Sequence, residues 1–120
     1  MSKPVSKGIT VRQGDIWMAN LNPIKGSEQS GLRPVVILSG NMLNTITPVV
    51  FTAPLTTKIK RFKGNPVIQP DQENGLKQTS ELLVFHFRSM SKERLTEKIG
   101  NVRMEVVNIA VNTLNDLLKY

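Results

Sequence analysis

Short runs of β-branched and aromatic residues, each ended by glycine, proline, asparagine or serine, make up most of the chain. Such runs are typical of short β-strands joined by tight turns. They predict five strands, over residues 16–21, 34–39, 48–55, 65–68 and 80–88. A single helical turn over 91–94 and a last short strand over 98–102 follow. Short strands with tight turns favour a barrel.

The end of the chain follows a different period. Apolar residues recur there at three- and four-residue spacing, at Val106, Val107, Ala110, Val111, Leu114, Leu117 and Leu118. This spacing places them on one face of a helix. We therefore predict an amphipathic helix over 103–119 that covers one face of the barrel.

Length and composition limit the domain organisation. A chain of 120 residues, 39% of them hydrophobic, can form one compact domain, which buries roughly two thirds of its unfolded surface. We assign this domain to residues 11–120 and expect residues 1–10 to form a flexible basic N-terminal tail. The chain has no cysteine, so it can form neither a disulfide nor a thiolate metal site. It shows neither a secretion signal nor an apolar run long enough to span a membrane, so we expect it in the cytoplasm.

The formal net charge of +7 comes from two places. Residues 1–12 carry Lys3, Lys7 and Arg12 without an acid, and residues 58–63, called here the basic loop, carry Lys58, Lys60, Arg61 and Lys63 without an acid. Positive charge concentrated in two short segments is typical of a polyanion-binding groove. In such a groove Phe62 would stack on an unpaired base. The alternative is a solvated loop with an incidental aromatic ring. No basic amphipathic helix suggests a membrane partner.

Residues 14–34 combine a strand, a polar loop punctuated by glycines, and an arginine where the next strand begins. Gly26 and Gly31 allow positive φ, and Pro34 forces Arg33 into an extended conformation. A guanidinium held at that point suits two charge-assisted hydrogen bonds to a phosphate. The alternative is that Arg33 pairs with Glu28 and holds the loop closed.

Four segments resemble the MazF/PemK family of toxin endoribonucleases, in family order and spacing. They are Gly-Ser-Glu-Gln-Ser-Gly-Leu-Arg-Pro (26–34), Pro-Val-Val-Ile-Leu-Ser (34–39), Ala-Pro-Leu-Thr (53–56) and Arg-Ser-Met-Ser-Lys-Glu-Arg-Leu (88–95). The resemblance covers nearly everything after residue 10. It implies a mainly β fold, a small SH3-like antiparallel barrel of the PemK/CcdB type with a C-terminal helix.

The resemblance also implies an activity that needs no familiar enzymatic motif. The chain lacks a paired-carboxylate motif, a Walker loop, a G-x-S-x-G motif and a metal-ligand cluster. In RNA the ribose 2′-OH is itself the nucleophile, so a protein need only align it and stabilise the phosphorane. The implied function is that of a type II toxin, an mRNA interferase that arrests growth. It would cleave single-stranded RNA at specific sequences without metal or cofactor, leaving a 2′,3′-cyclic phosphate and a 5′-hydroxyl.

By position, the family's catalytic arginine falls on Arg33 and its active-site threonine on Thr56. The resemblance implies that Arg33 stabilises the phosphorane and protonates the leaving oxygen, while Thr56 donates a hydrogen bond to a nonbridging oxygen. The alternative for Thr56 is a hydroxyl that caps the turn into residues 57–63. The expected substrate-binding residues are Glu28, Gln29, Thr57, Lys58, Lys60, Arg61, Phe62, Lys63 and Phe85.

The sequence departs from the family in the strand predicted over 80–88. Several relatives carry a carboxylate where this chain has Phe85. His86 follows, but strand alternation turns it to the opposite face, so we predict a packed or dimer-interface histidine rather than a catalytic one. Either another group abstracts the proton, or Phe85 stacks a base. Trp17 and Met18 are expected to pack in the core or at a subunit contact.

The resemblance implies partners as well. They are a second copy of the chain, with an RNA channel along the homodimer interface, a MazE-like antitoxin whose acidic tail occludes it, and operator DNA through the antitoxin complex. Two other functions stay open. A CcdB-like gyrase inhibitor would share the fold, but it relies on a C-terminal tryptophan and this chain ends in Lys119 and Tyr120. A barrel that binds nucleic acid without cutting it is compatible with Phe85.

Overall fold

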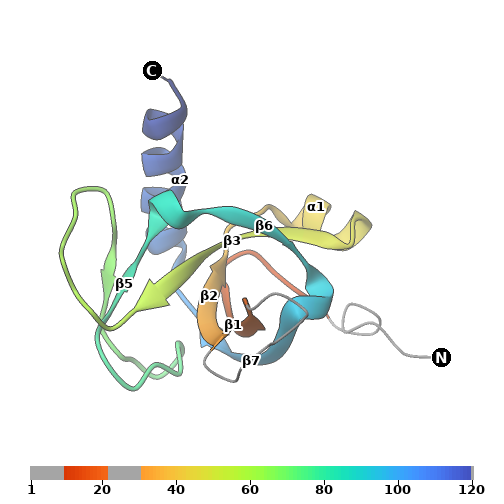
Figure 1. Ribbon diagram of the computed structural model, residues 1–120, viewed down its shortest axis with the longest axis horizontal. Helices are drawn as coiled ribbons and strands as arrows, with labels where there is room; N and C mark the ends of the chain where they lie inside the picture. The colour runs from red at the N-terminus through yellow and green to blue at the C-terminus, as the bar shows by residue number, and fades with distance from the viewer. Residues whose placement is uncertain (1–9, 22–30, 120) are drawn as a thin grey trace.

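The computed structural model describes residues 10–21 and 31–119, which form one curled antiparallel sheet and a C-terminal helix (Figure 1). The strands are β1 (Asp15–Asn20), β2 (Leu32–Ile37), β3 (Val49–Thr56), β4 (Val67–Ile68), β5 (Ser80–Leu82), β6 (Arg88–Ser91) and β7 (Leu95–Asn101). Their order is β4-β5-β3-β2-β1-β7, with β6 also paired to β3. The sheet curls into a half-barrel, so the predicted mainly β, small-barrel fold is confirmed.

The central strands bury side chains on both faces of the sheet. Since adjacent side chains of a strand point to opposite faces, neighbouring residues belong to two different apolar clusters. Ile16 and Val36 belong to one apolar cluster, which includes Val107 and Ala110 of helix α2 (Met104–Lys119). The neighbouring Trp17 lies in a second cluster and is 4% exposed. The core position predicted for Trp17 is therefore confirmed, while Met18 is half-buried.

Helix α2 has the predicted position, but only part of its apolar stripe packs on the sheet. Val107 and Ala110 are buried, and Val106 and Leu114 pack against them. The other predicted apolar positions are exposed, namely Val111, Leu117 and Leu118, the last at 80%. Figure 1 shows the reason, since the helix runs away from the sheet toward the C-terminus. The predicted helix over one face of the barrel is confirmed, but the C-terminal part of its apolar stripe does not pack on the sheet.

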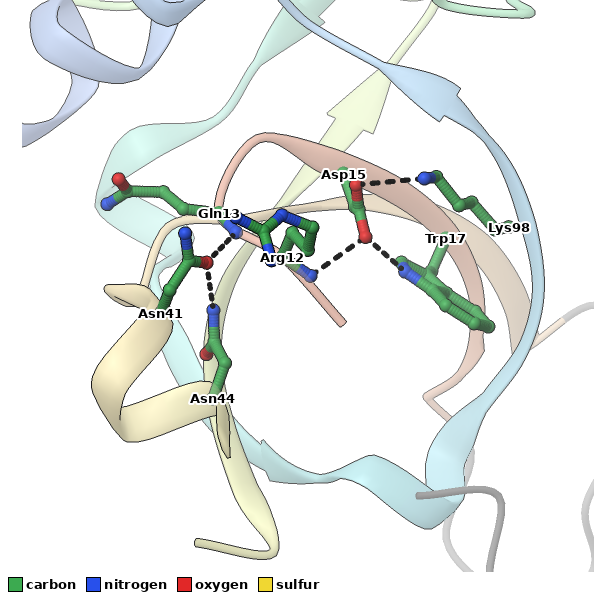
Figure 2. A network of polar contacts seen from close by, with 7 residues as sticks. All are labelled: Arg12, Gln13, Asp15, Trp17, Asn41, Asn44 and Lys98. Atoms are coloured by element: carbon green, nitrogen blue, oxygen red, sulfur yellow. Dashed lines mark hydrogen bonds and ion pairs between the residues drawn. The ribbon is translucent and has the colours of Figure 1, made fainter. Parts of the chain in front are cut away.

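A buried carboxylate joins the start of β1 to β7 (Figure 2). Asp15 Oδ2 accepts hydrogen bonds from the Arg12 backbone N–H at 2.9 Å and from Trp17 Nε1 at 3.2 Å. Its Oδ1 lies 3.2 Å from Lys98 Nζ. Nearby, the Gln13 N–H donates to Asn41 Oδ1 at 2.7 Å. These bonds tie the first described residues to the sheet edge and to helix α1 (Asn41–Ile46), which the sequence did not predict.

The strand predicted over 80–88 is interrupted, which is the main correction to the fold. The chain leaves the ladder after β5, makes the 3₁₀ turn η2 (Val84–His86), and returns as β6. The His86 and Phe87 N–H groups donate to Leu83 O and Val84 O, both at 3.0 Å, and close this turn. β3 therefore pairs with β6 along its first half and with β5 along its second.

The other boundaries differ less. The predicted turn over 91–94 is confirmed as η3 (Lys92–Arg94), whose Glu93 N–H donates to Ser91 Oγ at 3.1 Å. β7 begins three residues earlier than predicted, at Leu95, and β4 is limited to Val67–Ile68. Within the described ranges, no helix is long and apolar enough to cross a membrane. Most of the predicted tail, together with Gly26, Glu28 and Gln29, lies outside the described residues.

Candidate functional site

Antiparallel pairing brings the start of β2 to the end of β3, and with them Arg33 and Thr56. Val35 pairs with Pro54, and Arg33 and Thr56 lie two residues further along the same register on either strand. Both side chains line one hollow of about 430 Å³. Arg33 is exposed to solvent there. The structure thus brings together the two residues predicted to be catalytic, although they are 23 positions apart in the sequence.

The Thr56 hydroxyl already has one partner. Its Oγ1 accepts a hydrogen bond from the Lys58 backbone N–H at 3.1 Å, so the hydroxyl caps the turn into the basic loop, as the alternative interpretation held. A hydroxyl accepts and donates independently. The Thr56 proton therefore remains available to donate to a ligand in the hollow.

A second hollow, of about 230 Å³, adjoins the first and shares Thr56, Lys58 and Leu83 with it. Its other lining residues are Lys60, Phe62, Phe85 and His86. Of the remaining predicted binding residues, Thr57 lines the first hollow, whereas Arg61 and Lys63 are exposed and line neither. Together the two hollows place a cationic and aromatic surface beside Arg33.

Phe62 and Phe85 form an edge-to-face pair over the second hollow. Their ring centroids are 5.7 Å apart at an interplanar angle of 68°, and the side chains are 49% and 50% exposed. Half-exposed rings of this kind retain a surface on which an unpaired base can stack.

His86 does not lie where strand alternation placed it. Because η2 replaces the predicted strand, the side chains of Phe85 and His86 line the same hollow, and their ring centroids are 5.2 Å apart. His86 is exposed. The prediction that it faces away from the site as a packed residue is therefore wrong.

Glu81 is the residue of this region that the sequence analysis missed. Its side chain is fully buried. Its Oε1 accepts hydrogen bonds from the Lys60 and Arg61 N–H groups at 2.7 and 2.8 Å. Its Oε2 accepts from the Phe62 N–H and from Asn65 Nδ2, both at 3.1 Å. An acid inside an apolar run, Ser-Glu-Leu-Leu-Val, was the available signal.

The charge state of Glu81 follows from these contacts. Burial alone raises the pKa of the Glu81 carboxyl, but the donors from Arg61, Lys60, Asn65 and Phe62 together outweigh it, so its pKa lies below the ordinary value of 4.5. Glu81 is therefore a buried anion at neutral pH. The Glu81 carboxylate binds the basic loop only through backbone N–H groups. Among the described residues, the four cationic side chains of the loop form no ion pair.

No metal centre accompanies these groups in the described part of the chain, where no three His, Asp or Glu side chains are arranged to hold an ion. The chemistry that the described residues offer is the neutralisation of a phosphate by Arg33 and the basic loop, hydrogen bonding by Thr56, and proton transfer at the imidazole of His86.

Comparison with known proteins gives a consistent picture. Residues 12–118 match the profile of a family described as PemK-like, MazF-like toxin of type II toxin-antitoxin system. Endoribonuclease EndoA of Bacillus subtilis is 32% identical over 99 residues, covering 82% of this chain and 85% of that protein. Endoribonuclease MazF of Staphylococcus saprophyticus is 34% identical over 106 residues, covering 85% and 88%.

Solved structures share the fold. MazF of Deinococcus radiodurans superposes with a TM-score of 0.75 at 25% identity, covering 93% of this chain and 99% of that one. A MazE-MazF structure from the same organism gives a TM-score of 0.72 at 21% identity, covering 92% and 97%.

Proposed function

The chain belongs to the PemK-like, MazF-like family of type II toxins and is an endoribonuclease of that family; from this we propose that it cuts single-stranded mRNA at specific sequences without a metal ion. Attack by the 2′-OH leaves a 2′,3′-cyclic phosphate and a 5′-hydroxyl, and the loss of mRNA arrests translation and growth. The observation that carries this proposal is the meeting of Arg33 and Thr56 in one hollow beside the basic loop.

Each group in the hollow has a role in the proposed reaction. The Arg33 guanidinium donates to the nonbridging oxygens of the scissile phosphate, whose negative charge grows as the phosphorane forms. It also serves as the proton donor to the leaving oxygen. The Thr56 hydroxyl donates to a nonbridging oxygen while its Oγ1 keeps the bond from the Lys58 N–H. Loss of one such donor costs about 2.7–4 kcal/mol, or roughly 10²–10³ in rate.

Removal of the 2′-OH proton is assigned to His86. Histidine is the side chain that gains or loses its charge between about pH 5 and 8. His86 is the only histidine of the chain, and it lines the hollow that Thr56 shares. His86 would thus take the role of the carboxylate that several relatives carry where this chain has Phe85.

The flanking nucleotides bind the second hollow and the basic loop. Phe62 and Phe85 offer ring surface to an unpaired base, and Lys58, Lys60, Arg61 and Lys63 offer charge to the phosphates. Binding should weaken with salt, because each phosphate contact releases a counterion. Glu28 and Gln29, which the sequence predicts to bind substrate, are also proposed to bind the RNA.

The proposed partners follow from the relatives. The Deinococcus radiodurans structure contains MazE together with MazF. We extend this to a cytoplasmic homodimer whose RNA channel is closed by the acidic tail of a MazE-like antitoxin, and which contacts operator DNA through that antitoxin. An acidic peptide and RNA would then compete for one cationic groove.

The decisive experiment incubates metal-free protein with a long single-stranded RNA in EDTA and maps the cut ends. Wild type should make discrete cuts that leave 5′-hydroxyl ends, and Arg33→Ala should lose about 10²–10³ of the rate. Lys77→Ala is the matched control, because it removes another exposed cation outside both hollows.

Three results would contradict the proposal. Undiminished cutting by Arg33→Ala would exclude the arginine mechanism. RNA that is bound but left intact by wild type would favour the noncatalytic barrel. Inhibition of DNA gyrase without RNA damage would favour the CcdB-like function.

A further inference from the structure

We infer that Glu81 is a positioning residue, which holds the backbone of the basic loop in the shape that presents its cations and Phe62 to RNA. The inference rests on the proposed function for its ligand. Glu81 itself lines neither hollow and is fully buried. Any effect of Glu81 on RNA is therefore indirect, through the groups that its carboxylate holds in place.

The loop is held by one cross-strand pair. Thr56 at the end of β3 and Glu81 on β5 are direct antiparallel partners, so their side chains lie side by side on one face of the sheet. Thr56 Oγ1 accepts the N–H of Lys58, and the Glu81 carboxylate accepts those of Lys60, Arg61 and Phe62. Four N–H groups within five consecutive loop residues thus converge on this pair.

The bonds to Glu81 hold one residue of the loop in a strained backbone conformation. Arg61 has a φ of +57°, a left-handed backbone that side-chain-bearing residues disfavour. This turn lets successive N–H groups point at one anion, in the manner of an anion-binding nest. In this protein the anion is the protein's own carboxylate.

The far end of the loop is anchored as well. Gly64, with a φ of +95°, presents its carbonyl to Thr113 Oγ1 of α2 at 2.7 Å. The four cations of the loop and Phe62 are exposed. Glu81 binds backbone N–H groups of the loop and not its ammonium or guanidinium groups. It therefore fixes the loop without neutralising the positive side chains.

The first test compares Glu81→Gln with Glu73→Gln in the full-length protein. Each variant removes one negative charge, but Glu73 is exposed and outside both hollows. For cleavage of a fluorogenic RNA we expect Glu81→Gln to raise KM about tenfold or more with kcat within about threefold. The dependence of log KM on log salt should become shallower by about 0.7 for each cation that no longer meets a phosphate. Glu73→Gln should leave KM unchanged or lower it.

A second pair of variants disturbs the loop from its own side, in case Glu81→Gln fails to fold. Arg61→Gly and Arg61→Val lose the same charge, but glycine accepts a positive φ and a β-branched valine resists it. We expect Arg61→Val to raise KM several-fold above Arg61→Gly.

The outcomes separate this inference from the proposed function. Equal KM values for Glu81→Gln and Glu73→Gln, or for Arg61→Val and Arg61→Gly, would overturn it, as would a loss confined to kcat. Wild type that fails to cut RNA would refute the proposed function instead. Anisotropy with a fluorescent RNA carrying a 2′-deoxy sugar at the cut site then decides the role of the loop, since it measures binding alone.

Discussion

Replacing Thr56 by valine separates the two roles that the structure allows its hydroxyl. Valine has nearly the shape of threonine and suits the end of a strand, so Thr56→Val removes the hydroxyl and little else. The capping bond from the Lys58 N–H and the proposed bond to the phosphate are lost together. They differ in what they cost.

The structure sets the size of each loss. The capping bond is 3.1 Å long and lies at an exposed position, where the freed Lys58 N–H regains water. Its loss should reduce the free energy of unfolding by only about 0.5–1 kcal/mol. A donor to a phosphorane oxygen is worth about 2.7–4 kcal/mol, so kcat should fall roughly 10²–10³-fold.

The assay measures cleavage of a fluorogenic RNA at saturating concentration beside urea unfolding of the same preparations. Thr56→Ser keeps a hydroxyl and should recover kcat to within about tenfold of wild type. If Thr56→Val loses less than about tenfold in kcat while Arg33→Ala is inactive, Thr56 only caps the turn and the catalytic assignment is wrong.

Three further predictions concern the residues around this hollow. The pKa of native Glu81 lies below 4.5, so the stability that its carboxylate contributes is complete above about pH 5 and declines as the pH falls through the native pKa. Urea unfolding should show the gap between wild type and Glu81→Gln narrowing toward about pH 3, and a gap that widens there would contradict the sign. Phe85→Leu removes a stacking surface worth about 1–3 kcal/mol, so KM for RNA should rise roughly 5–150-fold with kcat preserved, and an unaltered KM would exclude stacking at this ring. His86→Asn should lower kcat about 10²–10⁴-fold with KM little changed, whereas an unchanged kcat would rule out proton transfer by His86.

The sequence by itself determined the features that depend on local pattern. Alternating and β-branched runs specified β1, β2 and β3, and the change to helical spacing specified α2, because each period reflects which side chains must leave water together. The segments around Arg33 and Thr56 carried the resemblance to the family. The acid-free basic run at 58–63 also located the basic loop without coordinates.

The tertiary structure decided which groups meet. Nothing local marks the break between β5 and β6, because it arises where β3 offers one edge to two segments in succession. That break moved His86 into the hollow with Phe85. Helix α1 was missed for a related reason. It has no side-chain cap, and its buried Asn44 is met by Lys92, whose Nζ donates to the Asn44 carbonyl from 48 residues away.

Glu81 shows the limit most clearly. In the sequence it is one acid in an apolar run, and its partners lie 16 to 21 positions earlier. A charged group can be buried only where enough donors surround it, and whether they do depends on the path of a loop that folds back from another strand. The periodicity of a segment predicts which of its own side chains are buried. Which polar groups pair inside the protein depends on how distant segments come together in the fold.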